Sequence, residues 1–238
     1  FWTARHSPNA VNLFVASDHH IPDPRAFRRS IAEAVAAAAE GRIVTLGVVP
    51  SEPSSAYGYI APAGQGLSNV LAFVEKPDSA TAQRYIAEGY LWNSGNFIVR
   101  ADVLVKEIGE RAPAVGEAVR IALEQAEIEG SCLTLGDGFK SAPKISIDYA
   151  VMEKTTRASV LPVQFDWSDL GAWDAVHASG EGDVGLHILE DSEGCLVRAC
   201  DGVMVAAIGL RDVGVIVERD AVLVTDLKRS QDVKRVVE

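Results

Sequence analysis

Residues 11–49 read VNLFVASDHHIPDPRAFRRSIAEAVAAAAEGRIVTLGVV, and this stretch decides the fold class. Val11 to Ala16 is a compact apolar run typical of a buried strand, and Ile43 to Val49 is another. Between them, Pro24 to Glu40 has apolar residues at helical spacing, with a proline near its start and Gly41 after its end. The spacing predicts a strand–helix–strand unit whose crossover suits a parallel pair of strands.

The same alternation continues to about residue 178. Strands are expected at 57–60, 70–74, 92–100 and 158–165, and helices at 80–88, 101–111, 115–129 and 147–153. Alternating elements of this kind predict an α/β domain over 1–178, with a mixed, mostly parallel sheet between helices.

A different composition begins near residue 183, after a linker expected at 178–183. Short apolar segments at 195–199, 203–208, 213–218 and 221–225 alternate with turn-like pairs, and 230–237 has helical spacing after Ser230. The region 183–238 is therefore predicted to be a small all-β unit or a β-helix-like tail with a closing helix.

Charge and composition exclude several classes of protein. The formal net charge is −11 and the basic residues form no stripe, so nucleic acid is not an expected partner. No apolar run approaches the ~20 residues that cross a bilayer, and the first residues do not resemble a signal peptide. Three cysteines without a CxxC pair favour a reducing, cytoplasmic setting over a disulfide framework.

Two acidic residues are candidate metal ligands. Asp18 follows a predicted buried strand, where ligands of open α/β sheets bind, and Asp169 lies between two tryptophans beside a glycine. If the two carboxylates meet, they could hold one Mg²⁺, which prefers oxygen ligands. The alternatives are a helix cap or turn for Asp18 and a turn with core tryptophans for Asp169. His19 and His20 show no metal spacing and are interpreted as flanking a loop.

Three further residues could contact hydroxyl or phosphate groups of a ligand, and a fourth begins a predicted helix. Glu75 could accept hydrogen bonds from hydroxyl groups and Lys76 could neutralise a phosphate, provided that the strand bends there. Asn93 can both donate and accept, which suits a vicinal diol. Asp148 lies in the first turn of a predicted helix, where its charge is favourable. A surface ion pair, a turn with a packed tryptophan and simple helix capping are the respective alternatives.

The order of these motifs resembles that of the mannose-1-phosphate guanylyltransferases, within the sugar-nucleotide pyrophosphorylases. The resemblance rests on SDHHI at 17–21, GRIVTLGVVPSEPSSAYGYI at 41–60, FVEKPD at 73–78, GYLWNSGNF at 89–97, SIDYAVMEK at 146–154, WSDLGAWDA at 167–175 and GVIVERDAVLVTDLKRSQDVKRVV at 214–237. It implies a Rossmann-like nucleotidyltransferase domain with a β-helix-like tail. The implied reaction joins GTP and mannose 1-phosphate to give GDP-mannose and pyrophosphate.

The resemblance also implies roles for individual residues. Asp18 and Asp169 would be Mg²⁺ ligands, and Lys76 a phosphate contact. The sugar-binding residues would be Tyr57, Gly58, Glu75, Asn93 and Asp148.

One departure from the family concerns its Gly-rich phosphate loop, of the form GGxGTRLxP, which nothing in residues 1–17 matches. We therefore expect a chain that lacks the upstream region and is inactive as it stands. Another nucleotide or sugar phosphate, or a non-catalytic regulatory role, is the alternative. The tail would offer strand edges suited to self-association, so a homodimer through it is a further expectation.

Overall fold

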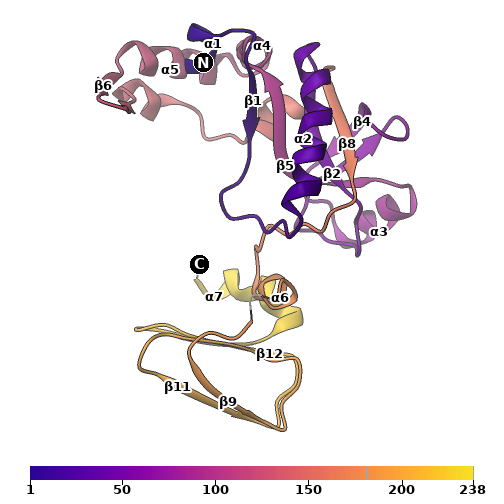
Figure 1. Ribbon diagram of the computed structural model, residues 1–238, viewed down its shortest axis with the longest axis vertical. Coiled ribbons are helices and arrows are strands. Elements are labelled where there is room, and N and C mark those ends of the chain that lie inside the picture. The colour runs from indigo at the N-terminus through magenta and orange to yellow at the C-terminus, as the bar shows by residue number, and fades with distance from the viewer. Residues whose placement is uncertain (181, 238) are drawn as a thin grey trace. The chain divides into compact units, whose positions relative to one another are not determined.

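The computed structural model describes residues 1–180 and 182–237. The chain divides into two compact units (Figure 1). The first comprises Phe1–Ser17 with Pro22–Asp166, and the second comprises Asp18–Ile21 with Trp167–Glu238. The predicted linker at 178–183 includes residue 181, which lies outside the described residues.

A six-stranded sheet forms the centre of the first unit, in the order β1-β5-β2-β8-β4-β3. Its strands are β1 (Val11–Phe14), β2 (Ile43–Val48), β3 (Tyr59–Pro62), β4 (Ser68–Val74), β5 (Leu91–Arg100) and β8 (Ala158–Val163). All six match predicted strands within a few residues. An α/β sheet between helices is thus confirmed.

The expectation of a mostly parallel sheet is wrong. Strands β1 and β2 do not pair, because β5 lies between them and runs antiparallel to both. Of the pairings described within this sheet, only β2 with β8 is parallel. A continuous apolar run shows that both faces of a strand are buried. This holds for a central antiparallel strand as well as for a parallel one, so the apolar runs could not distinguish the two.

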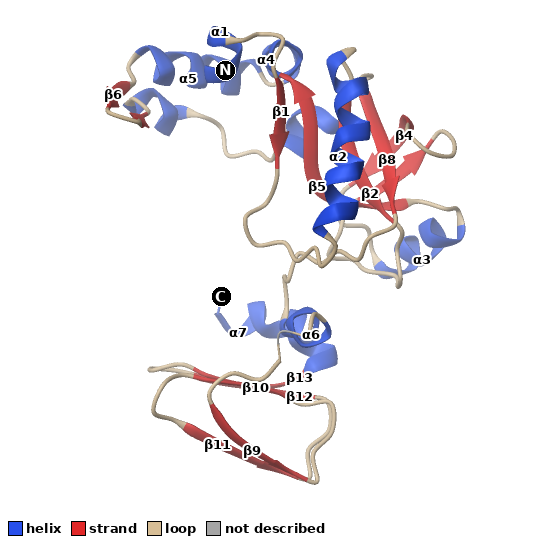
Figure 2. Cartoon of the chain, in the orientation of Figure 1, coloured by secondary structure: helices blue, strands red, loops and turns tan. Residues whose placement is uncertain are grey.

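Helices cover both faces of the sheet (Figure 2). The helical segments of the first unit are α1 (Trp2–His6), α2 (Pro24–Ala39), α3 (Ser79–Ala87), α4 (Ala101–Arg111), α5 (Pro113–Glu124), the 3-10 turn η1 (Asp137–Ser141) and the π-helical turn η2 (Asp148–Met152). Helix α2 begins where predicted, because the Asp23 carboxylate accepts hydrogen bonds from the amides of Arg25 and Ala26.

The predicted helix at 115–129 is partly wrong. Helix α5 begins at Pro113, which suits a first helical turn, and ends at Glu124. The chain then forms a hairpin of β6 (Glu127–Glu129) and β7 (Cys132–Thr134), which turns at Gly130 with a φ of +60°. Each strand has only three residues, too few for an alternating pattern to stand out, so the helical spacing of the preceding residues extended the predicted helix over β6.

The core of the first unit joins α4 and η2 to one face of the sheet. Phe97 and Val99 of β5 pack with Val103 and Leu104 of α4 and with Val151 of η2. The opposite face, toward which Ile98 points, is covered by α2 (Figure 1). This packing fixes the position of η2, which carries Asp148.

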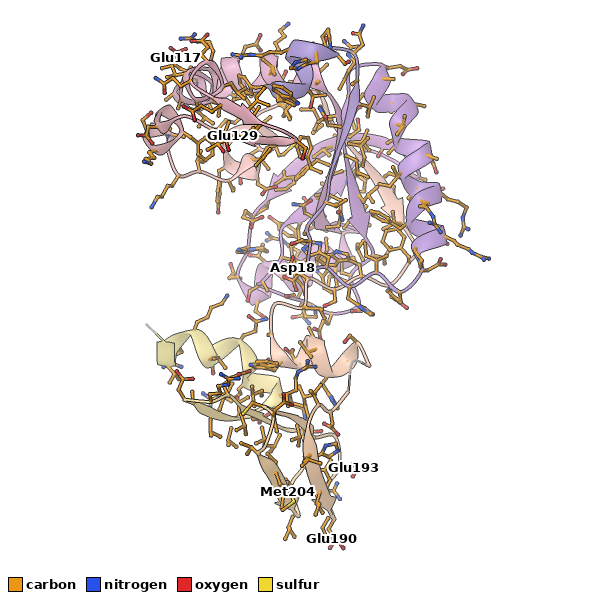
Figure 3. The ribbon with its side chains drawn as sticks, turned by 60° about the vertical axis from the view of Figure 1, so that its left-hand side comes forward. Asp18, Glu117, Glu129, Glu190, Glu193 and Met204 are labelled. Carbon is orange, nitrogen blue, oxygen red and sulfur yellow. The ribbon has the colours of Figure 1, made fainter. Side chains whose placement is uncertain are left out.

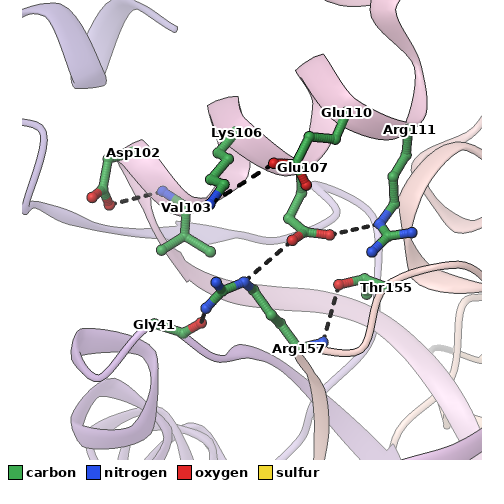
Figure 4. Close-up of polar contacts among 9 residues, drawn as sticks. All are labelled: Gly41, Asp102, Val103, Lys106, Glu107, Glu110, Arg111, Thr155 and Arg157. Atoms are coloured by element: carbon green, nitrogen blue, oxygen red, sulfur yellow. Dashed lines mark hydrogen bonds and ion pairs between the residues drawn. The ribbon is translucent and has the colours of Figure 1, made fainter.

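A buried glutamate adds a polar link to that core (Figure 4). The Glu107 side chain is only 3% exposed; its Oε2 accepts from Nε of Arg111 at 2.8 Å, and its Oε1 forms an ion pair with Arg157, 3.2 Å from Nε. Arg157 also donates to the carbonyl of Gly41 at 3.3 Å. The arginines lower the pKa of Glu107 although its burial opposes this, so the carboxylate stays ionised.

The tail of the second unit is β-helix-like, as predicted. After α6 (Trp173–Ala178) it contains β9 (Leu186–Glu190), β10 (Leu196–Ala199), β11 (Met204–Ile208), β12 (Val213–Val217), β13 (Val222–Asp226), the 3-10 helix η3 (Leu227–Val233) and α7 (Lys234–Val237). The parallel pairs Leu186–Met204, Leu196–Gly214 and Glu193–Arg211 each lie 18 residues apart, whereas the parallel bridge of Val184 with Arg198 spans 14. Stacked parallel coils are the signature of a β-helix.

The closing helix differs from its prediction. It starts as a 3-10 helix at Leu227, where the Asp226 carboxylate accepts from the amide of Lys228 at 2.9 Å. Ser230, the predicted cap, is instead buried and donates to Oδ1 of Asp174 at 2.6 Å. The predicted capping serine therefore joins this closing segment to α6.

The coils of the tail have an apolar interior and an apolar outer face. Val197, Ala199, Val215 and Val217 pack inside. Met204, 62% exposed, projects outward from β11 (Figure 3), and Leu186, Ile188 and Ile208 are also exposed. Within the described residues, no helix is long and apolar enough to span a membrane.

Candidate functional site

A bulge in β5 directs Asn93 toward its neighbours. Thr45 of β2 is opposite Phe97, but Gly47, two residues later, is opposite Asn93, so β5 carries extra residues between these pairs. Gly95 lies in the bulge with a φ of +70°, a conformation that glycine adopts without strain. Bulges re-aim side chains in this way next to functional sites.

The Asn93 amide has a fixed orientation. Its Oδ1 accepts from Oγ1 of Thr45 at 3.0 Å and from the Gly95 amide at 3.2 Å. Its Nδ2 donates to Oδ1 of Asp148 at 3.2 Å. Because an amide oxygen has two lone pairs and both are used, Asn93 has one N–H left for a ligand and no acceptor. The expectation that it also accepts from a diol is therefore not met in this arrangement.

Glu75 and Lys76 lie just beyond the end of β4, where the chain bends. Lys76 has a φ of +46°, an uncommon left-handed conformation for a residue with a side chain. The bend brings Nζ of Lys76 within 3.6 Å of Oε1 of Glu75, although neighbours on a straight strand would point apart. Lys76 is 61% exposed, so its charge remains available to an anion.

Gly58 leaves the space that the Glu75 carboxylate occupies. A Cβ atom at Gly58 would lie 2.5 Å from Oε2 of Glu75 and 3.5 Å from Cβ of Asn93. The backbone carbonyl of Gly58 accepts from the backbone N–H of Asn93 at 2.8 Å, and this bond joins the two segments. Gly58 is thus required by close approach.

Asp148 completes a group that we call the first-unit cluster: Gly58, Glu75, Lys76, Asn93 and Asp148. Burial raises the pKa of Glu75, and the charge of Asp148 raises it further while Lys76 opposes the shift. Burial likewise raises the pKa of Asp148, against the hydrogen bond from Asn93 and the charge of Lys76. Two partly desolvated carboxylates, a cation and an oriented amide suit a ligand with several hydroxyls and a phosphate.

Tyr57 lies at the edge of this cluster. Its ring packs against Trp92 with centroids 4.8 Å apart, at 62° between the planes. The neighbouring Tyr59 is buried in the sheet, and its hydroxyl accepts from the amide of Ser54 and donates to the Ser54 carbonyl, each at 3.0 Å. These contacts order the loop that leads to Gly58.

The second unit brings together the segments that carry Asp18 and Asp169. His20 and Ser168 form an antiparallel bridge in which the amide of each donates to the carbonyl of the other, at 2.8 and 3.1 Å. Asp18 precedes this bridge and Asp169 follows it, so both lie at the same end of the pair. Oδ1 of Asp169 accepts from the amide of Gly171 at 3.0 Å.

The donor set of these segments fits Mg²⁺. Mg²⁺ is usually bound through one or two carboxylates, with waters and substrate phosphates as its other ligands. In the described part of the chain, no group of three or more His, Cys, Asp or Glu residues could hold a metal by itself. A site made of Asp18 and Asp169 would therefore depend on phosphate oxygens for its remaining ligands.

Two residues that take part in these contacts were not identified from the sequence. Thr45 is fully buried in β2, and its hydroxyl gave no signal in an apolar run. His19, interpreted as a loop residue, has an Nδ1 that accepts from Nε1 of Trp167 at 3.2 Å. His19 directly follows Asp18, and Trp167 stands two residues before Asp169. This closeness of each ring to a candidate metal ligand is the signal that could have suggested the contact.

Comparison with known proteins identifies the family of the chain. The family model described as nucleotidyl transferase matches residues 2–183. The chain belongs to the nucleotidyl transferase family. A second model, described as a MannoseP isomerase/GMP-like β-helix domain, matches residues 185–238. The Rossmann-like transferase fold and the β-helix-like tail are therefore both confirmed.

Individual relatives narrow the likeness within the nucleotidyl transferase family. The chain is 40% identical over 241 residues to the alginate biosynthesis protein AlgA of Pseudomonas aeruginosa, covering 94% of this chain and 49% of that protein. It is 39% identical to a mannose-1-phosphate guanylyltransferase of Escherichia coli, covering 98% of this chain and 52% of the relative. The chain thus spans about half the length of the curated relatives it matches.

A solved structure extends the similarity to nearly the whole fold. A protein of Thermus thermophilus described as a mannose-1-phosphate geranyltransferase superposes with a TM-score of 0.85 at 32% identity. The match covers 99% of this chain and 71% of that one. This nucleotidyl transferase therefore resembles proteins named for mannose 1-phosphate in both sequence and fold.

Proposed function

We propose that this nucleotidyl transferase acts in the reaction of GTP with mannose 1-phosphate that gives GDP-mannose and pyrophosphate. The observation that carries the proposal is the first-unit cluster, in which Glu75, Lys76, Asn93 and Asp148 converge. The names of the relatives support mannose 1-phosphate as the substrate.

Each member of the first-unit cluster has a role in the proposal. Glu75 and Asp148 accept hydrogen bonds from sugar hydroxyls, and the free N–H of Asn93 donates one. Lys76 neutralises charge on the sugar phosphate. Gly58 and Tyr57 shape the sugar site, Gly58 by leaving room for the Glu75 carboxylate.

The proposed chemical step is an in-line displacement at phosphorus. A phosphate oxygen of mannose 1-phosphate attacks the α-phosphorus of GTP, and the bond from that phosphorus to the bridging oxygen breaks, so pyrophosphate leaves with the electron pair. Both substrates are anionic, so orientation and charge neutralisation by Lys76 contribute to catalysis, and no covalent enzyme intermediate is required.

Asp18 and Asp169 would hold Mg²⁺ in this proposal. When bound, the ion supplies charge neutralisation on the phosphates and a template for their alignment. Oδ1 of Asp169 accepts from the Gly171 amide, and this hydrogen bond orients the carboxylate. Asp18 contributes the other carboxylate from the same end of the bridge.

A pyrophosphate-release assay tests the function. The complete gene product is incubated with Mg²⁺, mannose 1-phosphate and each nucleoside triphosphate in turn, and release is expected to be fastest with GTP. Faster release with another nucleotide would reassign the base, and no release with any would leave the non-catalytic alternative.

The metal role has its own test. Asp169→Asn should abolish Mg²⁺-dependent release while the thermal unfolding midpoint stays near that of the wild type. Asp220→Asn, at an exposed position of the tail, is the matched control and should retain activity. Full activity of Asp169→Asn would rule out Asp169 as a ligand.

Two further expectations belong to the same proposal. Cys132, Cys195 and Cys200 are free thiols, which supports a cytoplasmic reaction.

The exposed Leu186, Ile188, Met204 and Ile208 of the tail support self-association as a homodimer. Sedimentation of the complete gene product tests self-association. If the exposed apolar face of the tail forms the dimer interface, Met204→Glu should shift the protein from dimer toward monomer.

A further inference from the structure

A side-chain hydrogen bond connects the segment that carries Asp18 to the segment that carries Asp169. Nε1 of Trp167 donates to Nδ1 of His19 at 3.2 Å, although the two residues are 148 positions apart in the chain. Their rings meet edge to face, with centroids 5.3 Å apart and planes at 85°. Both residues are half-buried, so water only partly competes for the contact.

This side-chain contact lies next to the His20–Ser168 bridge. His19 stands between Asp18 and the bridge, and Trp167 precedes it on the other segment. The backbone bonds fix the register of the two segments. The His19–Trp167 contact fixes how the chain leaves the bridge on the Asp18 side.

The two carboxylates differ in how they are held. Asp169 lies in a turn of its own, where Oδ1 accepts from Gly171, the amide of Leu170 donates to Oγ of Ser168, and Leu170 has a φ of +49°. For Asp18, in the described part of the chain, no side-chain hydrogen bond is found. Its position depends on the neighbours that hold its backbone.

We propose that His19 and Trp167 are positioning residues that hold the Asp18 carboxylate where it can share one divalent cation with Asp169. The inference rests on the proposed function, because it takes the two carboxylates as metal ligands. It adds residues that contact neither metal nor substrate. Groups that hydrogen-bond directly to metal ligands commonly change metal affinity by about 10- to 100-fold when they are removed, and His19 and Trp167, which act through the backbone of Asp18, are expected at the lower end of this range.

The direction of the hydrogen bond allows a specific test. Nδ1 of His19 is the acceptor, so the proton of the neutral ring is on Nε2. In His19→Asn, the amide oxygen can take the place of Nδ1 and accept from Trp167. Trp167→Phe keeps an aromatic ring but has no N–H, and His19→Ala removes both the acceptor and the ring.

Binding of Mn²⁺, used as a paramagnetic probe of the magnesium site, is measured on the complete gene product by electron paramagnetic resonance. Trp167→Phe and His19→Ala should each weaken Mn²⁺ binding by about tenfold, and His19→Asn should bind nearly as well as the wild type. The Mg²⁺ concentration for half-maximal turnover should rise in parallel, while the KM for mannose 1-phosphate at saturating Mg²⁺ stays unchanged.

A matched control is available in the first unit. His6 also packs against a tryptophan, Trp2, with ring centroids 4.0 Å apart, so His6→Ala removes a similar contact elsewhere and should leave Mn²⁺ affinity unchanged. Wild-type affinity in Trp167→Phe, or His19→Asn binding as weakly as His19→Ala, would overturn the inference.

Asp18→Asn separates this inference from the proposed function. If Asp18→Asn binds Mn²⁺ as the wild type does, the metal role of Asp18 itself is refuted. If Asp18→Asn loses binding while Trp167→Phe keeps it, only the positioning role is refuted.

Discussion

Replacing Gly58 with alanine would place a methyl carbon 2.5 Å from Oε2 of Glu75. Ordinary van der Waals contact begins at 3.4 Å, so the carboxylate must retreat by about 0.9 Å, the difference between these distances. Glu75 ends in a flexible side chain that can move, so the cost falls on the geometry of the site more than on folding.

A misplacement of about 1 Å can reduce a rate by about 100-fold. Because Glu75 is one of several sugar contacts, we expect Gly58→Ala to lower kcat/KM for mannose 1-phosphate by about 10- to 100-fold, equivalent to about 1.4–2.7 kcal/mol. Steady-state pyrophosphate release at varied mannose 1-phosphate measures this, and thermal unfolding checks that the fold is retained.

Gly64→Ala is the matched control, because a Cβ at Gly64 would have no atom within 4 Å. In a Glu75→Ala background, Gly58→Ala should have little further effect, since the displaced carboxylate is already gone. An unchanged kcat/KM in Gly58→Ala, or an equal loss on adding it to Glu75→Ala, would refute the reasoning.

Three other predictions concern charge. Asn93→Asp replaces a donor to Asp148 with a like charge, so the KM for mannose 1-phosphate should rise and rise most at high pH, as a pH series of KM values would show. Asp148→Asn should raise the thermal unfolding midpoint at pH 7: burial raises the folded-state pKa of Asp148, so its ionised form weakens folding, and the advantage should vanish below its ordinary pKa. Glu107→Gln leaves Arg111 and Arg157 without a carboxylate, so urea unfolding at pH 7 should show a loss of about 2 kcal/mol, the scale of a hydrogen bond to a charged group. Because the pKa of Glu107 is lowered in the folded state, this loss should shrink only when the pH falls below the ordinary pKa of a glutamate and acid neutralises wild-type Glu107.

The elements of the fold were predictable where local physics dominates. Helix α2 has both a capping aspartate and a proline at its start, and β2 is apolar at nearly every position. The neighbour of each strand was not predictable in this way, because β5 comes between β1 and β2 through contacts distant in sequence. Hydrophobic spacing records how a strand is buried and carries no record of its partner.

The repeat of the tail was also hidden from inspection of the sequence. Its coils turn at left-handed positions that stack at the same offset, Asp191 on Gly209 and Gly194 on Asp212. Each pair combines a glycine with an aspartate, so at these turns the residue type changes between positions 18 apart. The shared property is a positive φ, which is a backbone conformation that several residue types can adopt.

In the candidate site, the residues that carry charge were easier to find than their orientation. Glu75 and Lys76 were identified with the condition that the strand bend, and the left-handed Lys76 supplies that bend. The use of both Asn93 acceptor positions depends on Thr45 and on the bulge at Gly95, which no local pattern indicates.

The saturated carbonyl of Asn93 has a consequence for analogues of the sugar. The remaining N–H of Asn93 can only donate to a ligand, so in the proposed function the sugar hydroxyl that faces Asn93 acts as the acceptor. Fluorine in place of that hydroxyl could still receive the hydrogen weakly, whereas an amino group that is protonated at neutral pH has no lone pair to accept it. At this position of the ring, fluorinated sugar phosphates should therefore keep the contact with Asn93 that aminated ones lose.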